Sequence, residues 1–212
     1  MARLHPVAVP ADYERLLRRR RLRPRQGAPL YLEEKLDGTL IVAYDGRLYT
    51  GSGRRPGPRL QRLLREAAVD AAEASRGGKL LYLELYGGPV TGSGEGWHSG
   101  EPLSAALVDA ARAPAHVGPV AEAAPLARHL VPAEKRSLAE AIGARHPRSL
   151  VLSLAPKPWE LPRLSAAWPG REGAVLKLYA ADGHRLPPDM GFKTRGILEV
   201  KLRRSWYPSA WV

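Results

Sequence analysis

The chain alternates short apolar runs with turn-forming residues, and this pattern predicts more strands than helices. Residues 38–53 show it most clearly: an apolar run, the dipeptide Asp45-Gly46 and a second run form the pattern of a β-hairpin. Hairpins imply antiparallel pairing, so the pattern predicts an α+β fold in a single domain. The other segments expected to form strands are residues 30–38, 79–88, 149–156, 172–179 and 196–207.

Helical spacing is confined to a few segments. Leucine and alanine recur three and four positions apart over residues 58–76, which predicts an amphipathic helix. Residues 12–21 predict a short helix with a strongly basic end. Residues 115–149 indicate helical pieces separated by prolines, and residues 104–111 fit a strand or a helix equally. Residues 88–103 are polar and glycine-rich, which is typical of a loop.

The charge of the chain favours a polyanionic partner. It has 33 lysines and arginines against 21 aspartates and glutamates, which gives a net charge of +12. Such a surplus is typical of nucleic-acid-binding proteins, although a solvated basic surface without a partner has the same composition. Residues 1–29 are expected to form a basic N-terminal helix and linker. Its candidate contacts to nucleic acid are Arg18, Arg19, Arg20 and Arg21.

Other features of the composition exclude several classes of protein. The chain has no cysteine, so it forms neither disulfides nor a thiolate metal site. It contains no apolar run of the roughly 20 residues that a membrane span requires, and its N-terminus lacks the pattern of a signal peptide. We therefore expect a cytoplasmic protein without a membrane partner. The absence of asparagine and the many charges fit a heat-adapted source.

The segment YLEEKLDG, residues 31–38, contains the first candidate for chemistry. Lys35 ends an expected strand, and Asp37 follows two residues later. Alternate residues of a strand point to the same side, so we expect Lys35 and Asp37 to face one pocket. A lysine in such a place serves as a cation for phosphate or, when its amine is neutral, as a nucleophile. The segment alone also fits a surface ion pair beside a glycine turn.

Three further expected strands carry charged residues among apolar neighbours. Glu84 lies inside YLELYGG, and Glu172 and Lys177 flank the apolar part of REGAVLKLY. Lys201 and Arg203 share one face of LEVKLRR. Burying a carboxylate is costly unless it is paired or binds a ligand. Four such stretches in one chain therefore indicate a common site.

The order of these stretches resembles the signature of the covalent nucleotidyltransferase superfamily, which comprises ATP-dependent DNA and RNA ligases and mRNA capping enzymes. K-x-D-G stands at residues 35–38, E-L-Y-G at 84–87, E-G-x-V-x-K at 172–177 and Lys-x-Arg at 201–203. The resemblance implies an antiparallel-sheet-rich adenylation domain. Because the chain ends soon after the last motif, we expect residues 1–212 to form this domain without a C-terminal OB domain.

By this resemblance, Lys35 is the nucleophile that attacks the α-phosphate of ATP and forms a lysyl-AMP. Lys177 and Lys201 would hold that phosphate, and their charge would help to keep the amine of Lys35 neutral. Glu172 would bind Mg²⁺ or Mn²⁺. Glu84 would contact the ribose or the metal.

The resemblance implies further contacts to ATP. Glu33 or Glu34 would lie near the adenine. Arg54 stands where the family has an arginine near the ribose and the 5′-phosphate of the nucleic acid. Arg195 stands six residues before Lys201, as a similar arginine does in DNA ligases. The remaining assignments are Gly38 and Val175 to ATP, Asp37 to catalysis, and Arg55 and Arg203 to nucleic acid.

Departures from the family pattern favour an RNA ligase. DNA ligases and capping enzymes usually place an arginine two residues after K-x-D-G, where this chain has Leu40. The last basic motif combines Lys201 with Arg203 instead of two lysines. The segment FKTR offers Lys193 and Arg195 at the same spacing, but we prefer Lys201 because its strand is more apolar.

We therefore predict an ATP-dependent RNA ligase, which seals 5′-phosphate and 3′-hydroxyl ends through a lysyl-AMP and an adenylylated 5′ end. The expected cofactors are ATP and Mg²⁺ or Mn²⁺, and the expected partner is nucleic acid, RNA before DNA. Two alternatives stay open: the catalytic domain of an ATP-dependent DNA ligase, and a nucleic-acid-binding protein that keeps the fold without turnover. A capping guanylyltransferase fits the departures less well.

Overall fold

The chain folds into two compact units, each with its own β-sheet. Unit 1 contains the described residues from Asp37 to Pro147, and unit 2 contains those up to Leu36 and from Arg148 onward. The computed structural model describes residues 9–18, 30–67, 69–90, 97–98, 100–114, 118–179 and 197–207.

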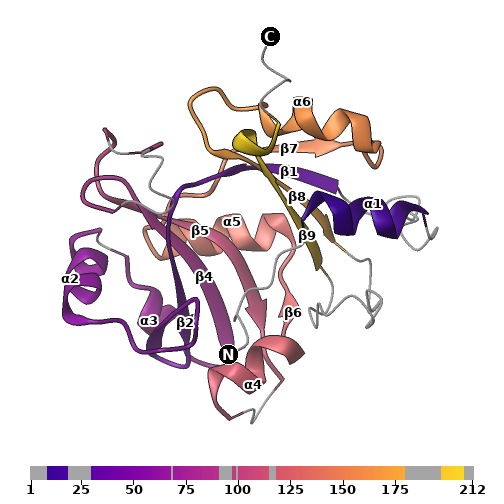
Figure 1. The fold of residues 1–212 in the computed structure, drawn as a ribbon. Helices are drawn as coiled ribbons and strands as arrows, with labels where there is room; N and C mark the ends of the chain where they lie inside the picture. Colours follow the sequence, from indigo (N-terminus) through magenta and orange to yellow (C-terminus); the bar gives the residue numbers. More distant parts are fainter. Residues whose placement is uncertain are drawn as a thin grey trace. The chain divides into compact units, whose positions relative to one another are not determined.

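Unit 2 is built on a four-stranded antiparallel sheet with the strand order β7-β1-β8-β9 (Figure 1). The strands are β1 Leu30–Lys35, β7 Ser149–Leu152, β8 Gly173–Tyr179 and β9 Ile197–Arg203. The helical elements are α1 Pro10–Arg18, α6 Leu161–Ser165 and the 3₁₀ turns η2 Pro158–Glu160 and η4 Arg204–Trp206. All four strands lie within segments that the apolar runs predicted.

The two faces of the unit 2 sheet differ in chemistry. One face is apolar and packs against α1 and α6, with Tyr13, Leu161 and Trp168 in its core. The hydroxyl of Tyr13 donates a 2.7 Å hydrogen bond to the carbonyl oxygen of Pro156, and burial raises the pKa of this phenol. Because side chains alternate along a strand, the other face receives most of the charged residues that the sequence singled out.

Unit 1 contains a five-stranded antiparallel sheet with the order β3-β2-β4-β5-β6. Its strands are β2 Gly38–Tyr44, β3 Arg47–Thr50, β4 Lys79–Tyr86, β5 Ser104–Arg112 and β6 Arg128–His129. The hairpin turn between β2 and β3 is confirmed: Asp45 and Gly46 have φ of 48° and 73°, the left-handed pair that a tight hairpin requires. Residues 104–111, which fitted either element, form a strand.

Helices cover both faces of this sheet. They are α2 Pro58–Glu66, α3 Ala71–Ala74, α4 Val120–Ala123 with the 3₁₀ turn η1 Ala124–Leu126, and α5 Pro132–Ala141. Side chains of α2, α3 and α5 join one core cluster, which includes Ile41 and Leu83. Side chains of α4 join a second cluster on the other face, which includes Val42 and Tyr82.

The single helix predicted over residues 58–76 is wrong, because the chain forms two helices there. α2 ends at Glu66, and α3 begins only at Ala71. The backbone N–H of Asp70 leaves the helical pattern and donates to the carbonyl oxygen of Ile142 at 3.3 Å. This tertiary hydrogen bond replaces a helical one, which spacing alone does not reveal. Within the described ranges, none of the helices is long and apolar enough to cross a membrane.

Candidate active site

Three neighbouring strands of unit 2 bring the charged motif residues to one face of the sheet. The register pairs Lys35 of β1 with Gly173 of β8, and Gly173 with Arg203 of β9. Two residues further along β8, Val175 pairs with Lys201 of β9. Since alternate residues of paired strands share a face, Lys35, Lys201 and Arg203 lie on the same side of the sheet.

Lys35 is bound to Glu172. Its ammonium Nζ donates a hydrogen bond to Oε2 of the carboxylate. The other oxygen, Oε1, lies 2.9 Å from Nε of Arg203. The Glu172 side chain is fully buried, and that of Lys35 is 10% exposed. One carboxylate therefore joins the predicted nucleophile to the last basic motif.

Gly173 permits this arrangement. A Cβ at this position would lie 2.0 Å from the carbonyl oxygen of Leu202 and 3.0 Å from the Cα of Arg203. Any larger residue would therefore push β8 and β9 apart. The preceding residue, Glu172, also accepts a 2.9 Å backbone hydrogen bond from Arg204. The glycine of E-G-x-V-x-K thus keeps Glu172 close to β9.

Lys177 is held between two carboxylates. Its Nζ lies 2.9 Å from Oε2 of Glu33 and 2.8 Å from Oε1 of Glu199. All three side chains are buried. Ionised groups are stable away from water only when they are paired in this way. The lysine predicted to hold the α-phosphate is therefore neutralised by carboxylates of the chain itself.

Glu34 lies apart from this cluster. Strand alternation directs it away from the face of Glu33 and Lys35. Its two oxygens accept hydrogen bonds from the backbone N–H and the Nε of Arg148 at 3.0 and 3.1 Å, and Arg171 Nε lies 3.2 Å away. Such a buried, doubly paired carboxylate stabilises the unit. Of the two glutamates predicted near the adenine, Glu33 is the one on the face of Lys35 and Lys177, and the contact to the adenine stays a prediction.

The polar face combines seven charged side chains. A triphosphate can bind to such a face because lysine and arginine contact phosphate oxygens directly. The carboxylates keep three of these cations, Lys35, Lys177 and Arg203, in place and offer oxygen ligands for a divalent metal. The cations are Lys35, Lys177, Lys201 and Arg203, and the carboxylates are Glu33, Glu172 and Glu199.

The other motif residues belong to unit 1. Asp37 is buried immediately before β2, and Gly38 begins that strand. A Cβ on Gly38 would lie 2.2 Å from the carbonyl oxygen of Leu85, so this glycine lets β2 approach β4. The shared pocket of Lys35 and Asp37 stays a prediction, as does the role of Gly38 toward ATP.

Glu84 and Arg54 occupy different parts of unit 1. Glu84 is half-buried on β4, where it pairs with Leu40 of β2 and Ala106 of β5. Arg54 is exposed in the loop after β3, and its carbonyl oxygen accepts a 2.8 Å hydrogen bond from the N–H of Thr50. Their expected contacts to the ribose, the metal and the 5′-phosphate stay predictions.

Comparison with known proteins gives a structural likeness. Neither a protein-family model nor a curated protein matches the sequence. A Naegleria gruberi RNA ligase variant solved with ATP and Mn matches with a TM-score of 0.58 and 13% identity, over 98% of this chain and 58% of that one. An apo variant of the same ligase matches with a TM-score of 0.62 and 13% identity, over 96% of this chain and 56% of that one.

The chain has the fold of an RNA ligase nucleotidyltransferase domain. It spans less than two thirds of the length of the ligase chains it matches. An antiparallel-sheet-rich nucleotidyltransferase fold was predicted from the motif order, and the likeness confirms it.

Several residues predicted for the site lie outside the described part of the chain. They include three arginines of the N-terminal run, the arginine expected six residues before Lys201, and the rival basic motif. Arg18, the one described member of the N-terminal run, is exposed and pairs with Glu14 at 3.8 Å. The residues outside the described ranges are Arg19, Arg20, Arg21, Lys193 and Arg195.

Sequence reasoning missed Glu199, although a signal for it was present. Glu199, Lys201 and Arg203 alternate along one strand, so the rule that placed Lys201 and Arg203 on one face also applies to Glu199. Glu199 is a buried carboxylate in an apolar strand, like Glu172 beside its own strand. The same cost of burial should have marked it for the site.

Proposed function

We propose that this chain is the catalytic domain of an ATP-dependent RNA ligase that becomes adenylylated on Lys35. One observation carries the proposal: Lys35 is bound to Glu172 on a sheet face that also presents Lys177 and Arg203. These residues are the lysine of K-x-D-G, both charged residues of E-G-x-V-x-K and the end of the last basic motif.

The first step is nucleotide transfer to the protein. Nζ of Lys35, as a neutral amine, attacks the α-phosphorus of ATP. A P–N bond forms, the P–O bond to pyrophosphate breaks, and a proton leaves the nitrogen. In the structure this nitrogen donates to Glu172, so Lys35 must leave that carboxylate before it attacks.

Lys177, Lys201 and Arg203 would stabilise the negative charge that grows on the phosphate oxygens. A fixed cation in a site shielded from water does this more effectively than a mobile one, because it needs no reorganisation during the reaction. Lys177 is already fixed by Glu33 and Glu199 at 2.9 and 2.8 Å. We propose that phosphate oxygens take over part of this pairing when ATP binds.

Glu172 is the residue that would hold Mg²⁺ or Mn²⁺. Mg²⁺ is commonly bound through one or two carboxylates together with substrate phosphates and water, and a single buried carboxylate beside cations fits this pattern. The described residues contain no cluster of three or more metal-binding side chains, so the phosphates would complete the coordination. The ion would neutralise phosphate charge. The Naegleria gruberi ligase variant solved with ATP and Mn supports a divalent ion as a cofactor, and the choice of Glu172 rests on its place in the motif and beside Lys35.

The later steps would seal a strand. The 5′-phosphate of the strand attacks the phosphorus of lysyl-AMP, the P–N bond breaks, and the AMP is now joined to the strand through a pyrophosphate bond. A 3′-hydroxyl then attacks the 5′-phosphate, loses its proton and displaces AMP. Leu40 in place of the arginine of DNA ligases and the likeness to RNA ligases support RNA as the substrate.

A nick-sealing assay tests this function. Duplexes with one nick, bearing 5′-phosphate and 3′-hydroxyl ends, are offered with RNA or DNA at the nick, with ATP and Mg²⁺ or Mn²⁺. We expect the RNA strand to be joined faster, and joining to require both ATP and the metal. Faster joining of DNA would favour the DNA ligase alternative. Joining of neither strand would contradict a ligase.

A further inference from the structure

The segment from β3 through α2 in unit 1 concentrates exposed arginine. Between residues 46 and 69 the sequence has six arginines and one acidic residue, Glu66. Crowding like charges raises the energy of the folded chain unless an anionic partner neutralises them. All six side chains are exposed: Arg47, Arg54, Arg55, Arg59, Arg62 and Arg65.

Three of these arginines are available to an external anion. Arg47, Arg55 and Arg65 form no ion pair with any residue that the structure describes. Arg55 instead lies over the ring of Tyr49, with 5.5 Å between its Cζ and the ring centroid. Several arginines elsewhere in the described chain pair with carboxylates, for example Arg15 with Asp12, Arg76 with Glu73 and Arg171 with Glu34.

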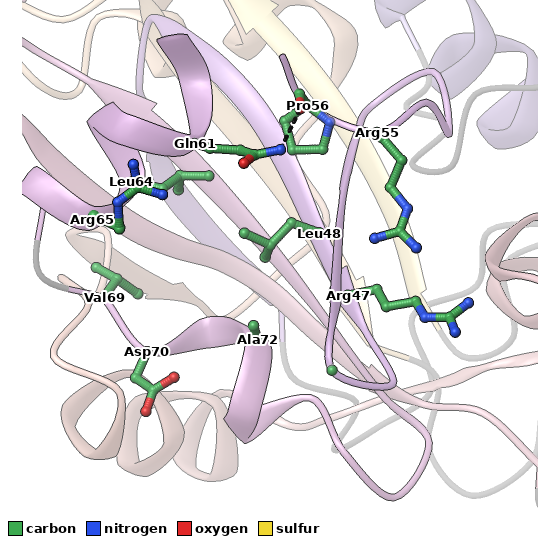
Figure 2. A pocket seen from close by; sticks show the side chains of 11 residues that line it. Arg47, Leu48, Arg55, Pro56, Gln61, Leu64, Arg65, Val69, Asp70 and Ala72 are labelled. Carbon is green, nitrogen blue, oxygen red and sulfur yellow. Dashed lines mark hydrogen bonds between the residues drawn. The ribbon is translucent and has the colours of Figure 1, made fainter. Parts of the chain in front are cut away.

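A cavity of about 390 Å³ opens beside this segment, between β3, α2 and α3 (Figure 2). Figure 2 shows Leu48 pointing toward Leu64, whereas Arg47 and Arg55 extend to the other side of the hairpin. The cavity therefore has an apolar floor, which is lined by Leu48, Leu64, Val69 and Ala72. Polar residues complete the lining, namely Arg47, Arg55, Gln61, Arg65 and Asp70, and the guanidinium groups of Arg47 and Arg55 lie across the hairpin from the floor.

Hydrogen bonds fix the walls of the cavity. The hydroxyl of Ser75 donates to the carbonyl oxygen of Ala72 at 2.7 Å and accepts from the N–H of Gly46 at 3.0 Å, which ties α3 to the hairpin turn. The side-chain amide of Gln61 donates to the carbonyl oxygen of Pro56 at 2.8 Å, as Figure 2 shows. A cavity with fixed walls binds a ligand without a cost for ordering them.

The chemistry of the cavity suits one base of a single strand, and the arginines beside it suit the phosphates of neighbouring nucleotides. Its volume lies in the range of small-molecule sites, and an apolar floor accepts the faces of a nucleobase. The amide of Gln61 and the carboxylate of Asp70 can bond to the polar edge of a base. Guanidinium groups bind phosphate oxygens in pairs. An acidic peptide would use the arginines but not the apolar floor.

We propose that this segment holds the single-stranded part of the polynucleotide, with one unpaired base in the cavity and neighbouring phosphates on Arg47, Arg55 and Arg65. The inference rests on the proposed function only where it names the polynucleotide as the ligase substrate. It gives unit 1 a substrate-binding surface of its own, in addition to the predicted N-terminal arginine run.

The charge component is tested by binding of a 5′-fluorescein-labelled, single-stranded oligouridylate to the full chain, measured by anisotropy at several salt concentrations. The triple variant Arg47→Ala, Arg55→Ala, Arg65→Ala should bind at least about tenfold more weakly near physiological salt. A plot of the logarithm of the binding constant against the logarithm of the salt concentration should have a slope that is smaller in magnitude by about 2, because each phosphate contact on a single strand contributes about 0.7 to it. Arg112→Ala, on β5 and three strands away from β3 in the same sheet, should bind like the wild type.

The cavity component is tested by filling it without a change of charge. Ala72→Phe should weaken binding of single-stranded RNA at least about fivefold, because a stacked base is lost. Binding of a blunt RNA duplex, which has no unpaired base, should stay unchanged. Thermal melting shows whether Ala72→Phe is folded. If it is not, Gln61→Met, which keeps the charge and removes the amide from the lining of the cavity, is expected to give the same selective loss.

Two results would overturn the inference. One is wild-type affinity and salt dependence in the triple variant. The other is equal displacement of the labelled RNA by polyglutamate and by unlabelled RNA, because the surface would then recognise charge alone. Formation of protein–AMP, measured in parallel, separates this outcome from the proposed function. The control Arg112→Ala should form the adduct at the wild-type rate, whereas a wild type without adduct would contradict the ligase and leave the RNA-binding result valid.

Discussion

Oε1 of Glu199 lies 2.8 Å from Nζ of Lys177, on strands β9 and β8, where the two residues are direct partners in the register. Glu33 on β1 approaches the same ammonium at 2.9 Å. The lysine that we propose for the phosphates of ATP thus links three strands through buried charges. Lys177 therefore contributes to the stability of the sheet as well as to the proposed binding of ATP.

Loss of this lysine should destabilise the protein strongly. Lys177→Met would remove the ammonium that pairs with the buried carboxylates of Glu33 and Glu199, and breaking a buried ion pair from one side costs about 3–5 kcal/mol. Urea unfolding measures the loss. Combining Lys177→Met with Glu33→Gln and Glu199→Gln should recover part of the stability but no adenylylation. A loss of less than about 1 kcal/mol in Lys177→Met would show that the ion pairs are not formed in solution.

Substitution of the neighbouring residues Glu33 and Glu34 should affect protein–AMP formation differently. Glu34 is paired with Arg148 and Arg171 away from the polar face, so Glu34→Gln should lower stability by about 2–4 kcal/mol and leave protein–AMP formation intact once the variant is folded. Glu33→Gln removes one of two partners of Lys177 and should slow adduct formation. Rates measured on folded protein at low temperature compare the two. Slower adduct formation in Glu34→Gln than in Glu33→Gln would place Glu34 in the site.

Gly173 should tolerate no side chain. The Cβ of Gly173→Ala would lie 2.0 Å from the carbonyl oxygen of Leu202, which is closer than any van der Waals contact. We expect a loss of at least about 2 kcal/mol and slower adenylylation, because Glu172 and Arg203 move apart. Gly100→Ala is the matched control, since nothing lies within 4 Å of its added Cβ. Equal melting temperatures for both variants would contradict the close approach of β8 and β9.

Tyr13 should anchor the basic N-terminal helix to unit 2. Its hydroxyl donates to the carbonyl oxygen of Pro156 at 2.7 Å, so Tyr13→Phe leaves a buried acceptor unpaired and should cost about 1–3 kcal/mol. Tyr31→Phe is the control: the ring of Tyr31 packs edge-on against Tyr179, and its hydroxyl has no hydrogen-bond partner in the described chain. Calorimetry that ranks Tyr31→Phe as the more damaging change would show that α1 is not held through this bond.

Much of the fold could be predicted because the strands of this chain are short, apolar and separated by glycine. The alternation of side chains along a strand also predicted that Lys201 and Arg203 share one face, and the strand register confirms this. The break between α2 and α3 could not be predicted, since the leucine and alanine spacing continues through it while a hydrogen bond from Asp70 to Ile142 interrupts the helix. The spacing of apolar residues does not show where a tertiary hydrogen bond replaces a helical one.

The residues of the candidate site could be predicted from the sequence, but the ion pairs between them could not. Motif order identified Lys35, Glu172 and Lys177, whose charges meet on one face. The sequence does not reveal that Lys177 is neutralised by Glu33 and Glu199, because both contacts depend on the strand order β1-β8-β9. The arginine-rich lining of the unit 1 cavity was equally hidden, since it combines a hairpin with two helices.

The most direct test of the central claim is the intact mass of the protein after incubation with ATP or GTP and Mg²⁺ or Mn²⁺. The account predicts a gain of one AMP on the wild type and on Lys157→Ala, an exposed lysine of unit 2 outside the polar face. Lys35→Arg keeps a cation beside Glu172 and should fold normally, but should gain no AMP. A gain of GMP would indicate a capping-type enzyme. No adduct on a wild type that carries no AMP at the outset, or the same adduct on Lys35→Arg, would contradict the claim that Lys35 carries the nucleotide.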